Sequence, residues 1–375
     1  MSPVDPARRR RLRTWSPGQE RWQLCSANGP GTPLLDLASN DYLGLSRHPD
    51  LVAAATTALQ QEGVGAGGSR LVTGSRPSHD ELEQALARWL NRERVLLFPS
   101  GFQANIAAVS ALANRRSTVL ADRLIHHSLL VGVQASGARL QRFAHNDLAD
   151  LERRLASCNN NEPPLVISES LFSMEGTSPD LAVLARLCAA YGARLLIDEA
   201  HALGVLGSGG RGLCHGLSHP VHLISGTFGK AFGSGGAFLA GDAAMGERLL
   251  QTCGAFRYTT AMAPPLVAGA LAALKQIKAH PNWCDQLRNR ASCWRDALTQ
   301  RGWNRPAGKG PILPLIVGAD EDALRFQQTL EEAGLLCVAI RPPTVPEGRA
   351  RLRVVLRRDL PDNTLERFLS TLSRP

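Results

Sequence analysis

The stretch Ser225-Gly226-Thr227-Phe228-Gly229-Lys230-Ala231-Phe232-Gly233-Ser234-Gly235-Gly236 places one lysine in a glycine-rich turn. The preceding apolar run 221–224, interrupted only by His222, predicts the end of a buried strand. Small residues around Lys230 allow backbone and a phosphate group to approach closely. A lysine amine in a desolvated pocket can form an imine with a carbonyl group. A glycine-rich surface loop with a solvated lysine is the alternative, and the rest of the chain decides between the two.

Apolar runs that predict strands alternate with helical patterns around this stretch. The predicted strands are 95–98, 118–121, 140–143, 165–168, 194–197 and 221–224, and the helices between them include 148–156, 181–191 and one that ends at Ala113. Repeated strand–helix units predict an α/β fold with a doubly wound, mostly parallel sheet. Beyond Pro281 the pattern changes to helices 283–301, 321–333 and 363–372 and strands 312–317, 338–340 and 351–356. This change predicts a smaller α+β C-terminal domain.

We therefore expect an N-terminal arm (1–45), a large domain (46–280) and a small domain (281–375). The arm contains a basic segment from Arg8 to Arg13, predicted to be helical, and a short strand at 34–38. Two helices, 49–61 and 78–90, begin the large domain. Ser78 followed by Glu81 three residues later predicts a capping box at the start of the second helix.

Composition limits the class of protein. The chain has 375 residues, of which 44% are hydrophobic and 20% charged, as in an ordinary soluble globular protein. No apolar run is long enough for a membrane span, and no secretory signal is recognisable. Eight cysteines without CxxC spacing predict reduced thiols in a cytoplasmic protein and no metal site. The net charge of +9 can steer an acidic partner towards the protein, and a solvated basic surface without such a partner is the alternative. No nucleic-acid-binding motif accompanies this charge.

Five side chains capable of chemistry follow predicted strand ends: His126, Ser173, Asp198, His201 and Lys230. In doubly wound sheets, ligands bind at the carboxyl ends of the strands. We therefore expect these side chains to converge at one edge of the sheet.

A phosphate-binding site is predicted at the turn that begins with Ser100. The backbone N–H groups of Gly101 and Phe102 lie at the start of a predicted helix, and such termini bind phosphate. The hydroxyl of Thr227, three residues before Lys230, is a further phosphate donor. An ordinary serine N-cap is the alternative interpretation of the turn.

The same residues meet the requirements of pyridoxal 5′-phosphate, which needs an amine, a carboxylate, a stacking group and hydrogen-bond donors from the protein. Lys230 supplies the amine, and Asp198 keeps the pyridine nitrogen protonated. His126 can stack on the ring. His201 or Ser173 can donate to the ring oxygen.

Four motifs resemble those of the α-oxoamine synthases, a family of fold-type-I pyridoxal-phosphate enzymes. They are Asp198-Glu199-Ala200-His201-Ala202-Leu203-Gly204-Val205-Leu206-Gly207 with Gly210-Arg211-Gly212, the segment 225–230, Asn40-Asp41-Tyr42-Leu43-Gly44-Leu45, and Gly67-Gly68-Ser69-Arg70. The resemblance extends from about residue 35 to residue 357. It implies catalytic roles for Lys230, His126, Asp198 and His201, and cofactor contacts from these residues together with Gly101, Phe102, Ser173 and Thr227.

The resemblance also implies a homodimer with shared active sites, in which Thr259 or Thr260 reaches the partner's cofactor phosphate. Substrate contacts are implied for Arg13, Asn40, His126, Thr344 and Arg353. Arg353 resembles the arginine that binds the amino-acid carboxylate, a role for which a guanidinium is suited. A solvated arginine on a strand is the alternative for Arg353, and a helix cap or turn is the alternative for Asn40.

Within the family, segments 143–147 and 69–72 are most similar to the biotin-pathway member. That similarity implies a decarboxylative condensation of L-alanine with a pimeloyl thioester of coenzyme A or of an acyl-carrier protein. The glycine-using 5-aminolevulinate synthase and the threonine-catabolic 2-amino-3-ketobutyrate CoA ligase are the alternatives within the family. A catalytically silent partner subunit is a further alternative, although such subunits tend to lose the lysine that this chain retains.

Overall fold

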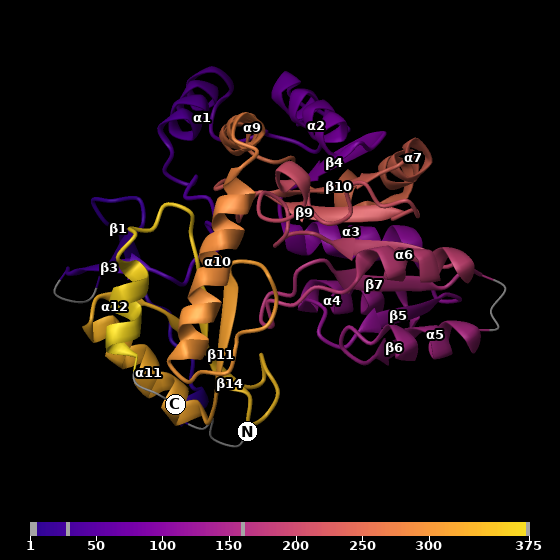
Figure 1. Ribbon diagram of the computed structural model, residues 1–375. Coiled ribbons are helices and arrows are strands. Elements are labelled where there is room, and N and C mark those ends of the chain that lie inside the picture. Colours follow the sequence, from indigo (N-terminus) through magenta and orange to yellow (C-terminus); the bar gives the residue numbers. More distant parts are fainter. Residues whose placement is uncertain (1–5, 28–30, 159–161, 373–375) are drawn as a thin grey trace. The chain divides into compact units, whose positions relative to one another are not determined.

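The computed structural model describes residues 6–27, 31–158 and 162–372 (Figure 1). Its internal contacts define two compact units. The larger unit comprises Leu45–Phe172 and Ser178–Cys284, and the smaller one comprises the described parts of Met1–Gly44, Ser173–Thr177 and Asp285–Pro375. Each unit is described separately below.

A seven-stranded sheet forms the centre of the larger unit. Its strand order is β4 (Arg94–Phe98), β10 (Ala237–Gly241), β9 (Leu223–Thr227), β8 (Arg194–Asp198), β7 (Leu165–Glu169), β5 (Thr118–Asp122) and β6 (Arg139–Phe143). Only β10 runs antiparallel to its neighbours, β4 and β9. The other pairs, from β9 through β6, are parallel, so the predicted α/β fold with a mostly parallel sheet is confirmed.

The register of the sheet aligns three polar residues of neighbouring strands. Glu169 of β7 pairs with Asp198 of β8, and Asp198 pairs with Ser225 of β9. These polar residues therefore lie side by side at the carboxyl edge. Strand β9 continues to Thr227, so Ser225 to Thr227 belong to the strand and not to the turn that the sequence suggested.

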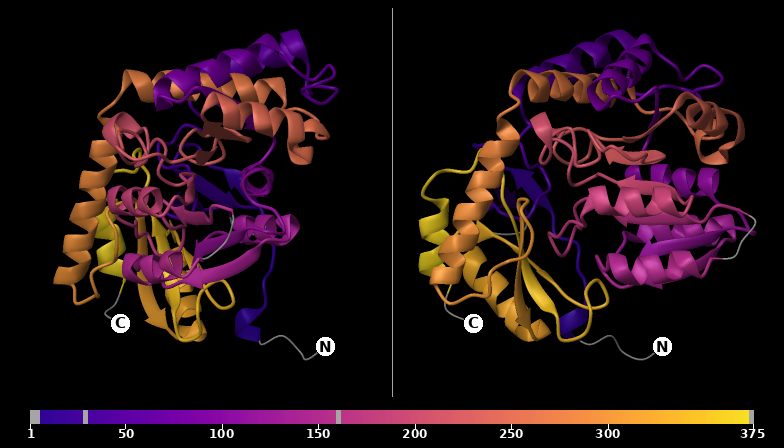
Figure 2. Two further views of the ribbon diagram at one scale, coloured as in Figure 1. Left: turned by 90° about the vertical axis from the view of Figure 1, so that its right-hand side faces the viewer. Right: turned by 45° about the vertical axis from the view of Figure 1, so that its right-hand side comes forward.

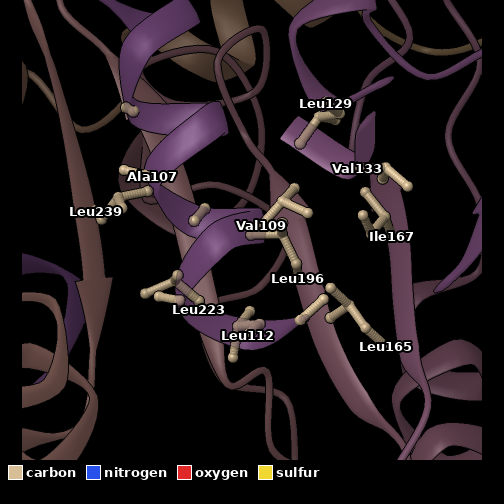
Figure 3. Packing of buried hydrophobic residues seen from close by; sticks show 14 of the residues in the cluster. Ala107, Val109, Leu112, Leu129, Val133, Leu165, Ile167, Leu196, Leu223 and Leu239 are labelled. Carbon is tan, nitrogen blue, oxygen red and sulfur yellow. The ribbon is translucent and has the colours of Figure 1, made fainter. Parts of the chain in front are cut away.

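Helices cover both faces of this sheet. Successive residues of β5, β7 and β8 are buried although their side chains point to opposite faces. On one face, α3 (Gly101–Leu112) and α4 (His127–Ser136) pack on the strands through the cluster of Ala107, Val109, Leu112, Leu129, Val133, Leu165, Ile167, Leu196, Leu223 and Leu239 (Figure 3). Helices α5 (Leu148–Ala156) and α6 (Leu181–Ala190) contact β5, β6 and β8 outside this cluster.

Three helices of the same unit pack together beyond the sheet: α1 (Pro49–Glu62), α2 (Pro77–Leu90) and α9 (Pro264–Ala279) (Figure 2). The predicted capping box at Ser78 is wrong. Helix α2 starts one residue earlier, at Pro77, because proline favours the first helical position. Arg76 is the N-cap, and its backbone N–H donates to His79 Nδ1 at 3.2 Å. The short helices α7 (Ala243–Thr252), α8 (Gly254–Arg257) and η2 (Ser208–Gly210) complete this unit.

The smaller unit contains two sheets. One has the order β1 (Trp15–Pro17), β2 (Gln23–Ser26), β3 (Pro33–Asp36) and β12 (Leu335–Leu336), and the other β11 (Ile312–Gly318), β14 (Ala350–Val355) and β13 (Val338–Ile340). Its helices are α11 (Asp320–Glu332), α12 (Thr364–Thr371) and most of α10 (Trp283–Gln300). Strand β3 pairs in parallel with β12, so the predicted arm shares a sheet with the C-terminal segment. The predicted boundaries between arm, large domain and small domain, after residues 45 and 280, stay predictions.

The predicted helix over Arg8 to Arg13 is wrong. Only the 3-10 turn η1 (Pro6–Arg8) is helical, and residues 9–14 have no regular structure. Long-range ion pairs hold this basic segment instead: Arg8 pairs with Asp320 and Glu347. None of the helices in the described ranges has the length and apolar character needed to cross a membrane.

Candidate active site

A pocket of about 210 Å³ lies at the carboxyl edge of the large sheet, next to the N-terminal ends of α3 and α4. Seven residues singled out in the sequence line it: Gly101, Phe102, His126, Asp198, His201, Thr227 and Lys230. The remaining lining residues are Asn105, Ser128, Glu169, Ala200, Ser225 and Gly226. The structure thus brings together most of the side chains expected to converge at this edge.

Lys230 lies three residues beyond β9 in a loop that two aromatic side chains anchor. Phe228 and Phe232 are fully buried, with ring centroids 5.5 Å apart. The backbone N–H of Gly233 donates to the carbonyl oxygen of Lys230 at 2.8 Å, closing the turn. Gly233 has a φ of +59°, and a Cβ there would lie 2.3 Å from the backbone nitrogen of Ser46, so only glycine fits. The loop therefore holds the half-buried Lys230 on the pocket wall.

Asp198 is the last residue of β8 and is buried. Its Oδ1 accepts the backbone N–H of Ala200 at 2.8 Å. Its Oδ2 accepts the side-chain amide of Asn105, also at 2.8 Å. A donor on each oxygen fixes the orientation of the carboxylate in the pocket. His201, which is also buried, follows in the turn after the strand.

The predicted phosphate site lies where α3 begins. Ser100 is the N-cap, and its hydroxyl accepts the N–H of Gln103 at 3.3 Å. The N–H groups of Gly101 and Phe102 have no intrahelical acceptor, because the first intrahelical bond runs from Ala104 N–H to Ser100 O, and they point out of the helix end. A Cβ on Gly101 would lie 3.7 Å from Thr227 Oγ1, so the Thr227 hydroxyl is next to this helix end. The serine cap and the predicted phosphate site are therefore compatible.

His126 is the N-cap of α4. Its Nδ1 lies 2.7 Å from the hydroxyl of Ser128 and accepts the backbone N–H of Ser128 at 3.3 Å. Its own backbone N–H donates to Glu169 Oε1 at 2.5 Å. The residue is exposed where it lines the pocket, but partial desolvation lowers the pKa of its imidazole. The charge of Asp198 opposes this pKa shift, and the charge of Lys230 adds to it.

Sequence reasoning missed three polar residues of the pocket: Asn105, Ser128 and Glu169. All three are almost completely buried. Glu169 ends β7, so the strand-end argument could have found it. Asn105 and Ser128 lie inside predicted or actual helices, where spacing alone does not distinguish them from structural polar residues.

Three further predicted residues meet in the smaller unit. The buried Arg353 of β14 donates from Nε to the backbone oxygen of Ser173 at 2.7 Å and from Nη2 to Asn40 Oδ1 at 2.9 Å. Tyr42 donates its hydroxyl to the same Asn40 oxygen at 3.2 Å. These contacts orient the guanidinium, and they make Arg353 a buried residue, unlike the solvated alternative. The cofactor contact predicted for the Ser173 hydroxyl stays a prediction.

The other predicted contacts lie outside the pocket. Exposed Arg13 forms a bidentate ion pair with Glu331, in which Nη1 lies 2.6 Å from Oε1 and Nη2 lies 2.9 Å from Oε2. Exposed Thr344 accepts a hydrogen bond from Arg10 at 3.0 Å. Thr260 is exposed and forms an isolated bridge with Ser69. Their predicted roles with substrate or with a partner subunit stay predictions. Within the described ranges, no cluster of three His, Cys, Asp or Glu side chains could hold a metal ion.

The chain belongs to the class I and II aminotransferase family, whose model matches residues 32–372. Its curated relatives include the 8-amino-7-oxononanoate synthase of Thioalkalivibrio sulfidiphilus, 43% identical over 347 residues that cover 92% of this chain and 88% of the relative. The enzyme of the same name from Pseudomonas putida strain W619 is 42% identical over 347 residues, covering 90% and 88%. These relatives confirm the resemblance to the α-oxoamine synthases.

Solved structures give the same result for the fold. Serine palmitoyltransferase from S. paucimobilis is similar with a TM-score of 0.91 and 27% identity, covering 96% of this chain and 91% of that one. An 8-amino-7-oxononanoate synthase from Francisella tularensis is similar with a TM-score of 0.79 and 26% identity, covering 90% and 96%. The predicted fold-type-I architecture is thereby confirmed.

Proposed function

We propose that this chain is a pyridoxal-phosphate-dependent acyltransferase that condenses L-alanine with a pimeloyl thioester. The products are 8-amino-7-oxononanoate, CO₂ and the free carrier thiol, which places the reaction in biotin biosynthesis. The observation that carries the proposal is the pocket that joins Lys230, Asp198 and the N-terminus of α3. The relatives that are 41–43% identical over at least 90% of this chain support the choice of substrates.

The residues of the pocket fit the proposed cofactor. Lys230 would supply the primary amine for its aldehyde carbon, and Asp198 would hold its pyridine N–H. The N–H groups at the start of α3 and the Thr227 hydroxyl bind its phosphate. His126 supplies a flat ring for stacking, and His201 a donor for the ring oxygen. When bound, the cofactor supplies an electron sink for a carbanion at the amino-acid Cα.

The chain's own groups bind the substrate and move its protons. Arg353 and Asn40 bind the carboxylate of L-alanine, a task for which the guanidinium fork is suited. Lys230 Nζ, released when the amino group of L-alanine takes its place, removes the Cα proton as general base. The Cα–acyl bond forms as the C–S bond of the thioester breaks, and the thiol takes up a proton. The carboxylate then leaves as CO₂, and a proton returns to Cα.

We propose in addition that the enzyme is a homodimer of the cytoplasm, with Thr259 or Thr260 reaching the partner's cofactor phosphate and with Arg13 and Thr344 contacting substrate. The exposed position of Thr260 next to Ser69 is compatible with a contact to a second subunit. The eight reduced cysteines fit a reducing compartment.

A substrate matrix tests the proposed reaction. The purified protein with added pyridoxal phosphate is assayed with L-alanine or glycine against pimeloyl or succinyl thioesters, each on coenzyme A and on acyl-carrier protein. We expect thiol and CO₂ release with alanine and a pimeloyl thioester, and loss of both in Lys230→Ala but not in the control Lys275→Ala. Preferential turnover of glycine with succinyl-CoA would instead identify a 5-aminolevulinate synthase.

A further inference from the structure

A chain of hydrogen bonds links Asp198 to His126 through two residues to which no role has been assigned above. Asn105 Nδ2 lies 2.8 Å from Asp198 Oδ2 and 2.9 Å from Ser128 Oγ. Ser128 Oγ lies 2.7 Å from His126 Nδ1. Asn105 and Ser128 are 3% and 0% exposed, so these two side chains are shielded from bulk water. Strand β8 is thereby connected through α3 to the N-terminus of α4.

The direction of each bond follows from the donors available. A carboxylate only accepts, so the Asn105 atom next to Asp198 must be the amide nitrogen. Its second hydrogen then points to Ser128 Oγ, which accepts it and turns its own hydrogen toward His126 Nδ1. The backbone N–H of Ser128 also donates to Nδ1, at 3.3 Å. With two donors directed at it, Nδ1 carries no proton, and the ring proton is on Nε2.

The hydrogen bonds of Asn105 use its amide nitrogen and not its amide oxygen. That oxygen is buried without a hydrogen-bond partner among the described residues. Leaving a buried acceptor unsatisfied destabilises a protein, and an apolar side chain of similar size would avoid this cost. The two N–H groups, both of which are used, are the feature that an apolar side chain could not supply.

We propose that Asn105 and Ser128 are positioning residues that connect His126 to Asp198 and hold its ring as the neutral Nε2–H tautomer. His126 lines the pocket, so Nε2–H is the ring nitrogen left to interact with a bound molecule. The charged and titratable groups around the ring are Asp198, Glu169, Lys230 and His127. The positioning acts on the same site as the proposed acyltransferase and, for its effect on catalysis, rests on that function.

The tautomer can be measured in the protein without cofactor. Two-bond ¹H–¹⁵N spectra of protein labelled with ¹⁵N-histidine distinguish Nδ1–H from Nε2–H rings, and His126→Asn assigns the signal among the ten histidines. We expect the Nε2–H pattern for the unmodified chain at pH 7.5. Ser128→Ala should introduce an Nδ1–H population, Asn105→Leu a smaller one, and Ser128→Thr should restore the original pattern because it keeps the hydroxyl.

Matched controls lie on the same two helices. Ser136→Ala removes a hydroxyl from α4 that donates to Val133, and Gln103→Leu removes an amide from α3 that donates to Ala255. Both should leave the His126 signal unchanged, and unaltered signals of the other histidines show that each variant is folded. An Nδ1–H pattern in the unmodified chain, or an identical pattern in Ser128→Ala, overturns the proposal. An unchanged His126 pattern in Asn105→Leu would exclude a positioning role for Asn105.

Kinetics provide a second readout. Loss of one such hydrogen bond corresponds to a fall of up to about tenfold in kcat/KM. We expect this fall in Ser128→Ala, with recovery in Ser128→Thr. The positioning role and the acyltransferase function can fail separately. An altered His126 tautomer in Ser128→Ala supports the positioning role whichever amino acid is the substrate. An unaltered tautomer in this variant overturns the positioning role even where activity is lost.

Discussion

Glu199 is a residue whose carboxyl group is fully enclosed behind the site. Its Oε1 accepts the backbone N–H groups of Leu213 and Cys214 at 2.6 and 3.1 Å. A Cβ on Gly212 would lie 2.2 Å from the other carboxyl oxygen, so this turn packs directly on the side chain. Burial raises the pKa of Glu199 from 4.5 to about 7, against the lowering effect of the two backbone hydrogen bonds.

This pKa predicts a pH-dependent stability. Between pH 4.5 and about 7 the folded chain keeps a proton that the unfolded chain releases, so the free energy of unfolding falls as pH rises through this window. The corresponding loss is about 3 kcal/mol. Glu199→Gln should remove this decline, as measured by urea unfolding at pH 5 and pH 8. The exposed Glu247→Gln is the control, and a decline in Glu199→Gln as steep as in the unmodified chain contradicts the assignment.

Arg353 gives a prediction for substrate binding. Lysine cannot reproduce the guanidinium contacts to Ser173 and Asn40 and bind a carboxylate with two further N–H groups. Charge-assisted hydrogen bonds contribute about 1.5–3 kcal/mol, so Arg353→Lys should raise the KM for L-alanine roughly 10- to 100-fold. Steady-state kinetics measure this, with the exposed Arg349→Lys as control. An unchanged KM for alanine excludes the carboxylate role.

The positions of Lys230, Asp198 and His126 at or after predicted strand ends were sufficient to predict that they share one pocket, because parallel strands end at one edge of the sheet. Asn105 could not be found in this way. It lies one turn into a helix, and its importance depends on Asp198, which is 93 residues away. Only the folded chain shows that the two side chains meet.

At the scale of elements, β9 is sensitive to the size of its residues. A Cβ on Gly226 would lie 2.4 Å from Phe238 Cζ and 2.6 Å from Leu203 Cδ1. We expect Gly226→Ala to destabilise the chain by about 1–3 kcal/mol in urea unfolding, as overpacked cores do. Gly229→Ala, where the nearest such contact is an ordinary 3.6 Å to Thr227 Oγ1, should change stability little. Equal stability of the two variants would contradict this packing.

Element prediction succeeded for long periodic segments and failed at boundaries and short pieces. Helices α5 and α6 were predicted within one residue of their ends. Helix α4 and strand β10 were missed. Strand β10 follows a glycine-rich run and contains mostly small residues, so its local pattern resembles a continued loop. It is a strand because β4 and β9 both pair with it.

For the whole molecule, the α/β class and the change of character beyond Pro281 could be predicted from the alternation of elements. The membership of the smaller unit could not. It joins residues from the start of the chain, the short segment Ser173–Thr177 and the C-terminal part. The pairing of Leu35 with Leu335 illustrates why, since no local pattern specifies a partner 300 residues away.

The proposed homodimer is a prediction at this scale. One chain has a mass of 40.3 kDa, so sedimentation equilibrium should give 2 × 40.3 = 80.6 kDa. Because the proposed sites are shared, dilution below the dissociation constant should reduce activity per subunit. A mass of 40.3 kDa at concentrations where the enzyme is fully active would contradict shared sites.

Lys230 is the amine proposed to bond to the cofactor, and the composition of the chain makes this role directly testable. The sequence has only four lysines: Lys230, Lys275, Lys278 and Lys309. Borohydride reduction of the protein loaded with pyridoxal phosphate fixes the cofactor to its lysine, and peptide mass spectrometry locates it. We expect the modification on Lys230 and its loss in Lys230→Ala. A modification on another lysine, or none in the loaded protein, would contradict this role.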